Sequence, residues 1–339
     1  MKTMPDFGMS IVETQRPHHH HEPAQRSNKI GIVGAGRVGT TVAYAALIRG
    51  VAKHISLYDP TRSKVNAEVL DLNHGLMFVP MASVEGSDDM QVLAGSDVIV
   101  FAAGASHPLG QTRMDLAAAN AAICRNLLPQ VQSVAPHALI LMVTNPVDVL
   151  TEVALKITGH ECACVFGSGT VLDSSRFRFL LAQHFGVSVQ SVHAYIAGEH
   201  GDSEIPLWSS ANIGNVLLDQ WHVSGYGHPL TEEEKQEIFN NVKNAGYEVL
   251  AGKGATNYAI GLTVVSILEA VFHDEGRVLP VSSRLENYQG ISGVCLSVPA
   301  IVDRGGVESV IPVPMTAGEQ AGLKASAERI RSVVSSLGY

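Results

Sequence analysis

The residues of this chain that could carry acid–base chemistry centre on His200. It stands in Gly198-Glu199-His200-Gly201-Asp202, where the chain leaves an apolar stretch over 192–197. Asp173 and Arg176 lie three residues apart in a helical pattern, so their side chains share one helix face. The acid could fix the tautomer of the imidazole and support its protonated form, while the guanidinium binds a substrate carboxylate through two parallel hydrogen bonds. The alternatives are a structural histidine and an Asp173–Arg176 ion pair with no further role.

A second source of chemistry is the loop from Ser106 to Arg113. It follows an apolar stretch that ends at Gly104, and it contains Pro108 and Gly110, a composition that favours a movable lid. On closure, Arg113 could polarise a carbonyl group and help to exclude water. The alternative is a solvated arginine at the start of the following helix.

A third group of residues predicts a dinucleotide site. The apolar run over 29–33 enters the glycines Gly34, Gly36 and Gly39, and a helical pattern follows. In such a strand–turn–helix unit the glycines allow the turn, the approach of a pyrophosphate and close helix packing, and the helix N-terminus attracts the anion. Asp59 ends the next apolar strand about twenty residues on, where a carboxylate accepts from a ribose 2′-hydroxyl and repels a 2′-phosphate. NAD is therefore expected in preference to NADP.

The elements that would position these residues form an alternating pattern. Apolar strands are predicted over 29–33, 54–59, 96–104 and 138–143, with helices over 64–72, 113–134 and 146–158 between them. Such alternation favours a doubly wound parallel sheet of the Rossmann type, in the α/β class. Ligands of these sheets bind beyond the carboxyl ends of the strands, which is where Gly34, Asp59, Gly104 and Asn145 fall.

The second half of the chain reads as α+β. Helices are predicted over 171–185, 232–250, 255–273 and 316–337, the last begun by a Thr316–Glu319 capping box. Between them, short strands over 277–283, 293–299 and 307–313 look antiparallel. We therefore predict an N-terminal arm over 1–27, an NAD-binding domain over 28–167 and a substrate domain over 168–339. No low-complexity linker separates the two domains, so they should share a broad contact.

Composition excludes several classes of function. The net charge of −9 offers no basic field for nucleic acid or an anionic membrane, and no apolar run has the length of a bilayer-spanning helix. The four cysteines, three of them in apolar runs, read as reduced thiols of a cytoplasmic protein, and their spacing indicates no metal site.

The arm over 1–27 holds four consecutive histidines and no periodic pattern. We expect it to be loosely attached, its histidines being a metal-chelating tract, a solvated polar tract or an expression remnant.

At this point the sequence resembles the NAD-dependent L-lactate and malate dehydrogenases, over roughly residues 29–337. Several motifs carry the resemblance in one order: 34–39 (GAGRVG), 57–59 (LYD), 103–105 (AGA), 110–113 (GQTR), 144–148 (TNPVD), 167–176 (GSGTVLDSSR) and 198–202 (GEHGD). The last motif, followed by 203–209 (SEIPLWS), is closest to the bacterial L-lactate branch, since malate enzymes usually carry a second glycine before the histidine.

The resemblance implies a role for each matching residue. His200 would donate the proton in ketone reduction, with Asp173 orienting it and Arg113 polarising the carbonyl. Arg176 would bind the substrate carboxylate, Asn145 the reacting oxygen, and Thr256 would line the pocket. The cofactor-binding residues would be Gly34, Gly36, Val38, Gly39, Asp59, Lys64, Gly104, Ala105, Asn126, Thr144 and Asn145.

One position departs from the family. Six residues before Arg113, lactate enzymes carry glutamine and malate enzymes arginine, whereas this chain has His107. A neutral imidazole cannot pair the second carboxylate of oxaloacetate, so we expect pyruvate to be preferred with modest discrimination. The alternatives are a solvent-facing His107 with a bulkier 2-oxo acid in the pocket, a malate or other L-2-hydroxy-acid dehydrogenase, and an inactive NAD-binding protein.

The resemblance also suggests regulation. In bacterial lactate dehydrogenases, residues that match Arg178 and His193 bind fructose 1,6-bisphosphate between subunits. Arg178 lies about 200° around the helix from Arg176 and must therefore face away from the proposed site. We expect a homotetramer or homodimer, with this effector site as a hypothesis; the alternative is a structural arginine and a packed histidine.

Overall fold

The fold is centred on one mixed sheet of eight strands. The computed structural model describes residues 28–105, 113–221 and 229–339, and for Arg113 only its backbone. Within these residues the strand order is β14-β13-β6-β5-β4-β1-β2-β3. The strands are β1 (Lys29–Val33), β2 (His54–Tyr58), β3 (Ser83–Ser87), β4 (Val98–Phe101), β5 (Leu139–Met142), β6 (Val165–Gly167), β13 (Ser282–Leu285) and β14 (Val294–Ser297).

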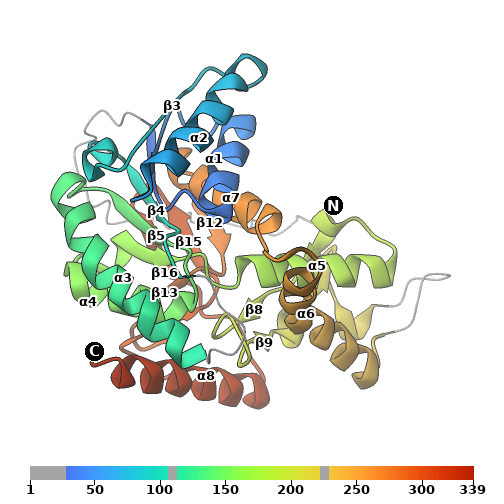
Figure 1. Ribbon diagram of the computed structural model, residues 1–339. Helices are drawn as coiled ribbons and strands as arrows, with labels where there is room; N and C mark the ends of the chain where they lie inside the picture. Colours follow the sequence, from blue (N-terminus) through green and yellow to red (C-terminus); the bar gives the residue numbers. More distant parts are fainter. Residues whose placement is uncertain (1–27, 106–112, 222–228) are drawn as a thin grey trace, which may run out of the picture.

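The six strands β1 to β6 run parallel, as the alternating pattern predicts. Helices cover both faces of this part of the sheet, which confirms the doubly wound α/β class (Figure 1). They are α1 (Arg37–Arg49), α2 (Arg62–His74), α3 (Arg113–Val134) and α4 (Val147–Thr158). Because both faces are covered, β4 and β5 are buried along their whole length.

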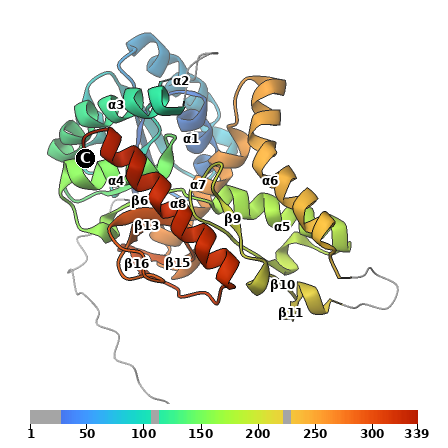
Figure 2. The ribbon, with the colours of Figure 1, turned by 90° about the horizontal axis from the view of Figure 1, so that it is seen from below.

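The helix α4 is buried almost all round. Every residue from Val147 to Leu155 is buried, including Asp148 and Glu152, because α4 packs between the sheet and the closing helix α8 (Ala317–Ser336) (Figure 2). A helix with no solvent face places any polar residue it carries in the protein interior. Asp148 is thus fixed at the start of α4, just beyond the carboxyl end of β5.

The second half supplies the remaining elements. Its helices are α5 (Val171–Phe185), α6 (Glu232–Lys253) and α7 (Tyr258–Phe272), and α5 and α6 lie side by side (Figure 1). Small sheets join β7 (Val192–His193), β10 (Asn212–Ile213) and β11 (Val216–Leu217), then β8 (Ile196–Ala197) and β9 (Ile205–Pro206), and finally β12 (Arg277–Leu279), β15 (Ala300–Asp303) and β16 (Gly306–Val310). The predicted capping box of Thr316 and Glu319 is present at the start of α8.

Several predicted boundaries are wrong in detail. The strand expected over 277–283 is two strands, since Pro280 separates β12 from β13, and β13 joins the large sheet antiparallel to β6. The strand expected over 192–197 breaks into β7 and β8. The edge strand β3 was not predicted because Val84 is its only buried residue, so it lacks an apolar signal. The arm over 1–27 and the loop over 106–112 lie outside the described residues.

Among the described residues, no helix is both long enough and apolar enough to cross a membrane.

Candidate active site

The segment that carries His200 is fixed by backbone pairing with β14. The Gly198 N–H donates to the carbonyl of Ser297 at 2.8 Å, and the Ser297 N–H donates back at 3.1 Å. Gly198 has a φ of +93°, which favours glycine, and a Cβ there would lie 3.0 Å from Ser326 Oγ. Gly198, the first residue of the motif, therefore allows the chain to turn sharply from β8 and present His200.

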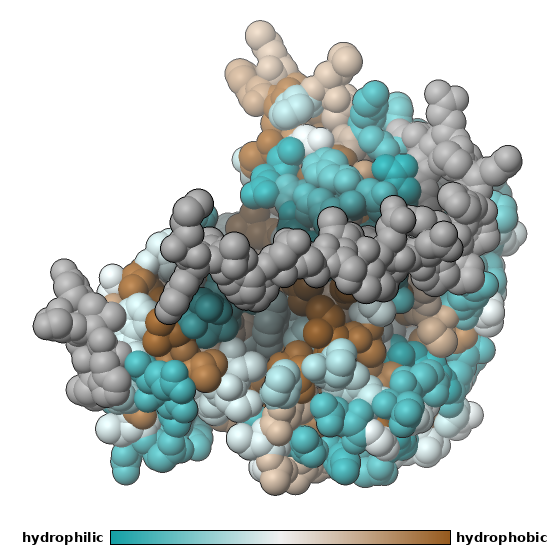
Figure 3. Space-filling view, turned by 180° about the vertical axis from the view of Figure 1, so that it is seen from behind, coloured by the Kyte–Doolittle hydropathy of each residue, from teal (hydrophilic) through white to brown (hydrophobic). Residues whose placement is uncertain are grey.

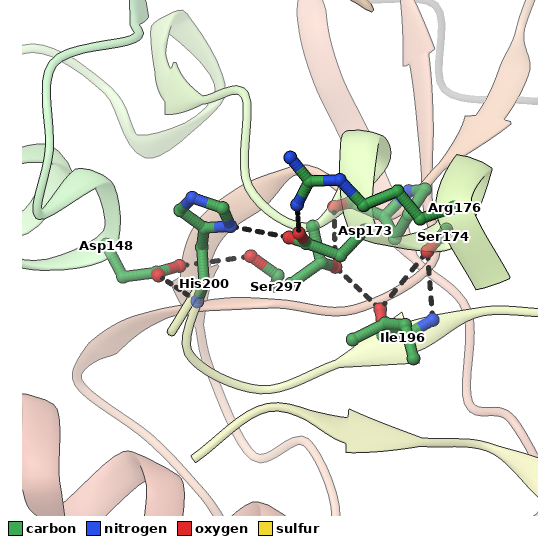
Figure 4. A network of polar contacts seen from close by, with 9 residues as sticks. Asp148, Asp173, Ser174, Arg176, Ile196, His200 and Ser297 are labelled. Carbon is green, nitrogen blue, oxygen red and sulfur yellow. Dashed lines mark hydrogen bonds and ion pairs between the residues drawn. The ribbon is translucent and has the colours of Figure 1, made fainter. Parts of the chain in front are cut away.

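Asp173 joins the two cationic groups that the sequence predicts (Figure 4). Its Oδ2 lies 2.5 Å from His200 Nδ1, and its Oδ1 accepts a hydrogen bond of 2.7 Å from Arg176 Nη1. Both Asp173 and Arg176 come from α5, one turn apart, so the acid is held between the helix and the histidine loop. The simple Asp173–Arg176 pair is present, but the same carboxylate also binds His200.

A second buried acid holds the backbone of the histidine. The His200 N–H donates to Asp148 Oδ2 at 2.7 Å, and Ser297 Oγ donates to Asp148 Oδ1 at 3.0 Å (Figure 4). Sequence reasoning assigned Asp148 no role. The available signal was an acid within an apolar helix start, because a buried carboxylate needs partners.

Electrostatics keep a proton on the His200 ring. Burial disfavours the charged ring, but the adjacent Asp173 carboxylate outweighs it and raises the pKa of His200 to about 9. Burial also opposes ionisation of Asp173, yet the His200 charge and its hydrogen bond, with Arg176, lower the pKa of this carboxyl. For Asp148, burial prevails and raises the pKa. The arrangement can therefore hold a proton beside a guanidinium, which suits reduction of an anionic carbonyl compound.

The glycine turn after β1 fits a dinucleotide. A Cβ at Gly36 would meet nothing within 4 Å, so the turn faces open space, whereas a Cβ at Gly39 would lie 2.0 Å from the carbonyl oxygen of Gly34. Gly36 is the N-cap of the helix α1 and provides no side-chain cap, so a phosphate can accept hydrogen bonds from the first N–H groups of the helix. The open approach at Gly36 and the close packing at Gly39 are the geometry that such a turn requires, and Val38 is partly buried in the first turn of the helix.

Asp59 lies at the end of β2 beside the glycine turn. It is buried and accepts hydrogen bonds from the Ala35 N–H at 3.1 Å, the Thr61 N–H at 3.0 Å and Lys64 Nζ at 2.8 Å. Burial opposes ionisation, but the Lys64 hydrogen bond and the backbone donors lower the pKa of Asp59. Asp59 and Lys64, both expected among the cofactor-binding residues, form an ion pair in the structure, with the carboxylate in its charged form.

Asn120 links the loops after β4 and β5. Its Oδ1 accepts from the Ala105 N–H at 2.8 Å, and its Nδ2 donates to the Asn145 carbonyl at 2.7 Å. Thr144 Oγ1 donates to the Ala103 carbonyl at 2.8 Å in the same region, next to Gly104. The residues predicted at these two strand ends are therefore brought together by an asparagine of α3 that the sequence analysis did not single out.

The family follows from two matches that together cover most of the chain. Residues 28–167 match the lactate/malate dehydrogenase NAD binding domain, and residues 170–337 match the lactate/malate dehydrogenase alpha/beta C-terminal domain. The chain belongs to the lactate/malate dehydrogenase family. It binds NAD through its first half, where Gly36 and Asp59 lie.

Individual relatives of this lactate/malate dehydrogenase are similar along nearly their whole length. An L-lactate dehydrogenase of Bifidobacterium animalis subsp. lactis is 49% identical over 93% of this chain and 98% of its own. An L-lactate dehydrogenase of a Thermoanaerobacter species is 42% identical over 91% and 99%. Among solved structures, the minor L-lactate dehydrogenase of Enterococcus mundtii aligns with a TM-score of 0.88 at 35% identity, covering 92% of this chain and 99% of that one.

Other predicted site residues of this dehydrogenase form no hydrogen bond to His200 or Asp173 among the described residues. Thr256 is partly buried in the connection between α6 and α7, and its neighbour Asn257 donates from Nδ2 to Thr41 Oγ1 of α1 at 3.0 Å. Asn126 is exposed on α3, where its oxygens accept hydrogen bonds from Gln130 one turn further along the helix. His107 and the side chain of Arg113 lie outside what the structure describes.

The two predicted effector residues lie on adjacent elements. Arg178 Nε donates to the Ala194 carbonyl at 2.8 Å, and the guanidinium lies 4.8 Å from the centre of the Tyr195 ring. His193 is exposed on β7. As helical geometry predicts, Arg178 and Arg176 have different partners and point in different directions from α5.

Proposed function

We propose that the protein is an NAD-dependent L-lactate dehydrogenase that interconverts pyruvate and L-lactate. The observation that carries this proposal is the single buried carboxylate of Asp173, which binds His200 through one oxygen and Arg176 through the other. A proton donor and a carboxylate-binding cation are thereby set at a fixed separation. A 2-oxo acid, with its carbonyl next to a carboxylate, matches that pair of groups.

The mechanism assigns one task to each residue. Because Nδ1 of His200 faces Asp173, Nε2 is the nitrogen that donates its proton to the carbonyl oxygen of pyruvate as it becomes an alkoxide. Arg176 binds the pyruvate carboxylate through the guanidinium N–H groups that Asp173 does not use. Asn145 donates to the reacting oxygen and Arg113 polarises it, while Thr256 lines the pocket. Bound NADH supplies the hydride.

The cofactor would be held by the residues that the fold groups at the strand ends. We assign its pyrophosphate to the turn of Gly34, Gly36, Val38 and Gly39, and its ribose to Asp59. Lys64 must share or release Asp59 when the ribose hydroxyls bind. The edge formed by Gly104, Ala105 and Thr144 lies beyond β4 and β5, where a dinucleotide crosses a doubly wound sheet. The assignment of Asn126 to the cofactor site has the weakest support, because the hydrogen bond that Asn126 forms is with Gln130.

Consumption of NADH with pyruvate, followed by absorbance, tests the function directly. His200→Ala should lower kcat by at least about a hundredfold, the lower end of general acid–base contributions. It should leave NADH binding, measured by fluorescence, within about twofold. Full turnover of His200→Ala, or no turnover of pyruvate by the native protein, would overturn the proposal.

Substrate choice depends on His107. We expect a higher kcat/KM for pyruvate than for oxaloacetate, with the difference narrowing from pH 8 to pH 6 because a protonated His107 can tolerate the second carboxylate of oxaloacetate. A preference for oxaloacetate over the whole range would contradict this assignment and favour malate.

We also propose a homotetramer or homodimer. Large apolar side chains stand exposed on α1, α2, α7 and the segment after α2: Tyr44, Ile48, Leu70, Met77, Phe78, Met81, Tyr258 and Leu262. Apolar residues also gather near the middle of the face seen from behind (Figure 3). Exposed apolar patches of this kind mark surfaces that another subunit covers.

Light scattering at micromolar concentration tests the assembly. Phe78→Asp, at an exposed phenylalanine after α2, should shift the assembly toward smaller species. A native protein that is monomeric throughout the concentration range would refute the assembly.

Arg178 and His193 are proposed to bind fructose 1,6-bisphosphate. The support is their position on neighbouring elements, with His193 exposed and Arg178 retaining its terminal N–H groups. Adding the sugar bisphosphate should lower the KM for pyruvate or promote assembly, and His193→Ala should weaken the response. No change in KM or in assembly would count against the site.

Two further assignments belong with this proposal. The division into an NAD-binding domain over 28–167 and a substrate domain over 168–339 separates the nucleotide turn from α5 and His200.

A cytoplasmic location is supported by the four cysteines, which are all free thiols.

A further inference from the structure

The side chain of Glu204 is an acid that the mechanism above does not use. It follows His200 by four residues, immediately before β9, and only 6% of it is exposed. Its Oε1 is buried and has no hydrogen-bond partner within the described residues. Its own N–H donates to the Gly201 carbonyl at 3.2 Å, which places Glu204 in the same tight turn as the histidine.

The charged groups around Glu204 are already engaged elsewhere. From α5, Arg176 is paired with Asp173, which is itself negative and close enough to act on Glu204. From α6, Lys243 Nζ donates to the Asp202 carbonyl at 2.9 Å. From α8, Arg329 lies beside Glu199 and Asp202, and from the loop itself His200 is bound to Asp173. None of the ion pairs among the described residues includes Glu204.

A carboxylate in this position is costly. Burial removes the hydration of the charge, and no cation pairs with it directly, so the neutral acid is the favoured form. Burial first, and then the Asp173 charge, raise the pKa of Glu204 to about 8, although His200, Arg176 and Lys243 act in the opposite direction. Near pH 7 the group is therefore mostly uncharged.

We propose that Glu204, a buried acid without a hydrogen-bond partner for Oε1 in the turn of His200, is a positioning residue whose negative charge, when present, restrains lactate oxidation. The proposal rests on the proposed function. Once ionised, Glu204 adds a negative charge near His200 and Arg176. This charge holds the proton on His200, which must be neutral to accept the proton of the lactate hydroxyl. It also competes with the lactate carboxylate for Arg176, so both effects act in the same direction.

Glu204→Gln tests this idea, because glutamine has the shape of the neutral acid but cannot ionise. At pH 6.5 the variant and the native protein should have kcat/KM values for L-lactate within about twofold. At pH 9 the ratio should reach about tenfold in favour of the variant, since a group that titrates near pH 8 leaves only about a tenth of the native enzyme neutral. Glu308→Gln, an exposed acid on β16, is the matched control and should give a flat ratio.

A stability measurement gives a readout that does not depend on activity. A glutamate whose folded-state pKa is raised contributes its full stability below the unfolded value of 4.5 and loses it as pH rises through about 8. The difference in urea midpoint, Glu204→Gln minus native protein, should therefore increase between pH 5 and pH 8 and stay constant at higher pH.

The outcomes separate the inference from the function on which it rests. A kcat/KM ratio that is constant across pH, whether near one or well below it, overturns the role of the charge, because a purely structural residue acts equally at every pH. Absence of lactate oxidation by the native protein would overturn the proposed function instead. A midpoint difference that is independent of pH would show that the pKa of Glu204 is the same in the folded and the unfolded protein, and it overturns the inference in either case.

Discussion

Replacing Asp173 by asparagine tests the reasoning about the active site most sharply. The substitution keeps the shape of the side chain and removes the charge that lies 2.5 Å from His200 Nδ1. Against the opposing effect of burial, that charge and its hydrogen bond are the main causes that raise the pKa of His200 from 6.5 to about 9, with Asp148 and Glu204 contributing less. In the variant, burial remains and the charge does not, so the pKa of His200 should fall to 6.5 or below.

The size of the effect follows from this difference. A fall of the His200 pKa from about 9 to about 6.5 corresponds to about 3 kcal/mol between the two protonation states of the ring. At pH 7.5 the charged fraction of His200 should fall from about 97% to about 10% or less by simple titration. We therefore expect pyruvate reduction to slow at least about tenfold at pH 7.5 and about 150-fold at pH 9, where about half of the native rings are still charged.

The assay is the pH profile of kcat/KM for pyruvate, supported by single-turnover oxidation of bound NADH. The alkaline limb of the profile should move from near pH 9 to pH 6.5 or below, and NADH affinity should stay within about twofold because Asp59 is untouched. Asp71→Asn, at an exposed acid of α2, is the matched control. An alkaline limb that remains near pH 9 in Asp173→Asn would refute the reasoning, since another group would then hold the proton on His200.

Three further predictions concern the cofactor site and the core. Asp59→Ala should weaken NADH binding by about 10- to 150-fold, which is the range for loss of a hydrogen bond to a charged group. NADPH binding should weaken less. Calorimetric titration with both nucleotides checks this, and equal losses of affinity for the two would contradict it. Gly39→Ala places a Cβ 2.0 Å from the Gly34 carbonyl oxygen, so the turn must shift at a cost of about 1–3 kcal/mol, and NADH binding by the folded variant should drop sharply. Phe166→Ala empties a fully buried position of β6 and should lower the free energy of unfolding by about 3–5 kcal/mol in urea titration; a loss below about 1 kcal/mol would show that the core closes around the gap.

The sequence predicted the parts of the fold and site that depend on local pattern. The glycine turn, Asp59 at the end of β2 and the Asp173–Arg176 spacing are set by short-range geometry, and each lies where the spacing predicts. The capping box at Thr316 is equally local.

Partners that come from distant elements escaped prediction. Asp148 meets the His200 N–H only because α4 is buried beside β14, and Asn120 reaches two loops only because α3 packs across them. The antiparallel strands were expected, but nothing in their apolar pattern specifies that β13 would add to the parallel sheet. Such contacts depend on the packing of whole elements rather than on spacing along the chain.

The two hydrogen bonds of Asp148 have a consequence for anyone who wishes to recombine this enzyme with its relatives. The acid belongs to the first half of the chain, yet its partners His200 and Ser297 belong to the second. A chimera joined near residue 168 would inherit the proton donor from one parent and its backbone anchor from the other. Exchange of substrate preference between such enzymes should therefore succeed when the crossover keeps α4, the histidine turn and the β13–β14 hairpin from a single parent.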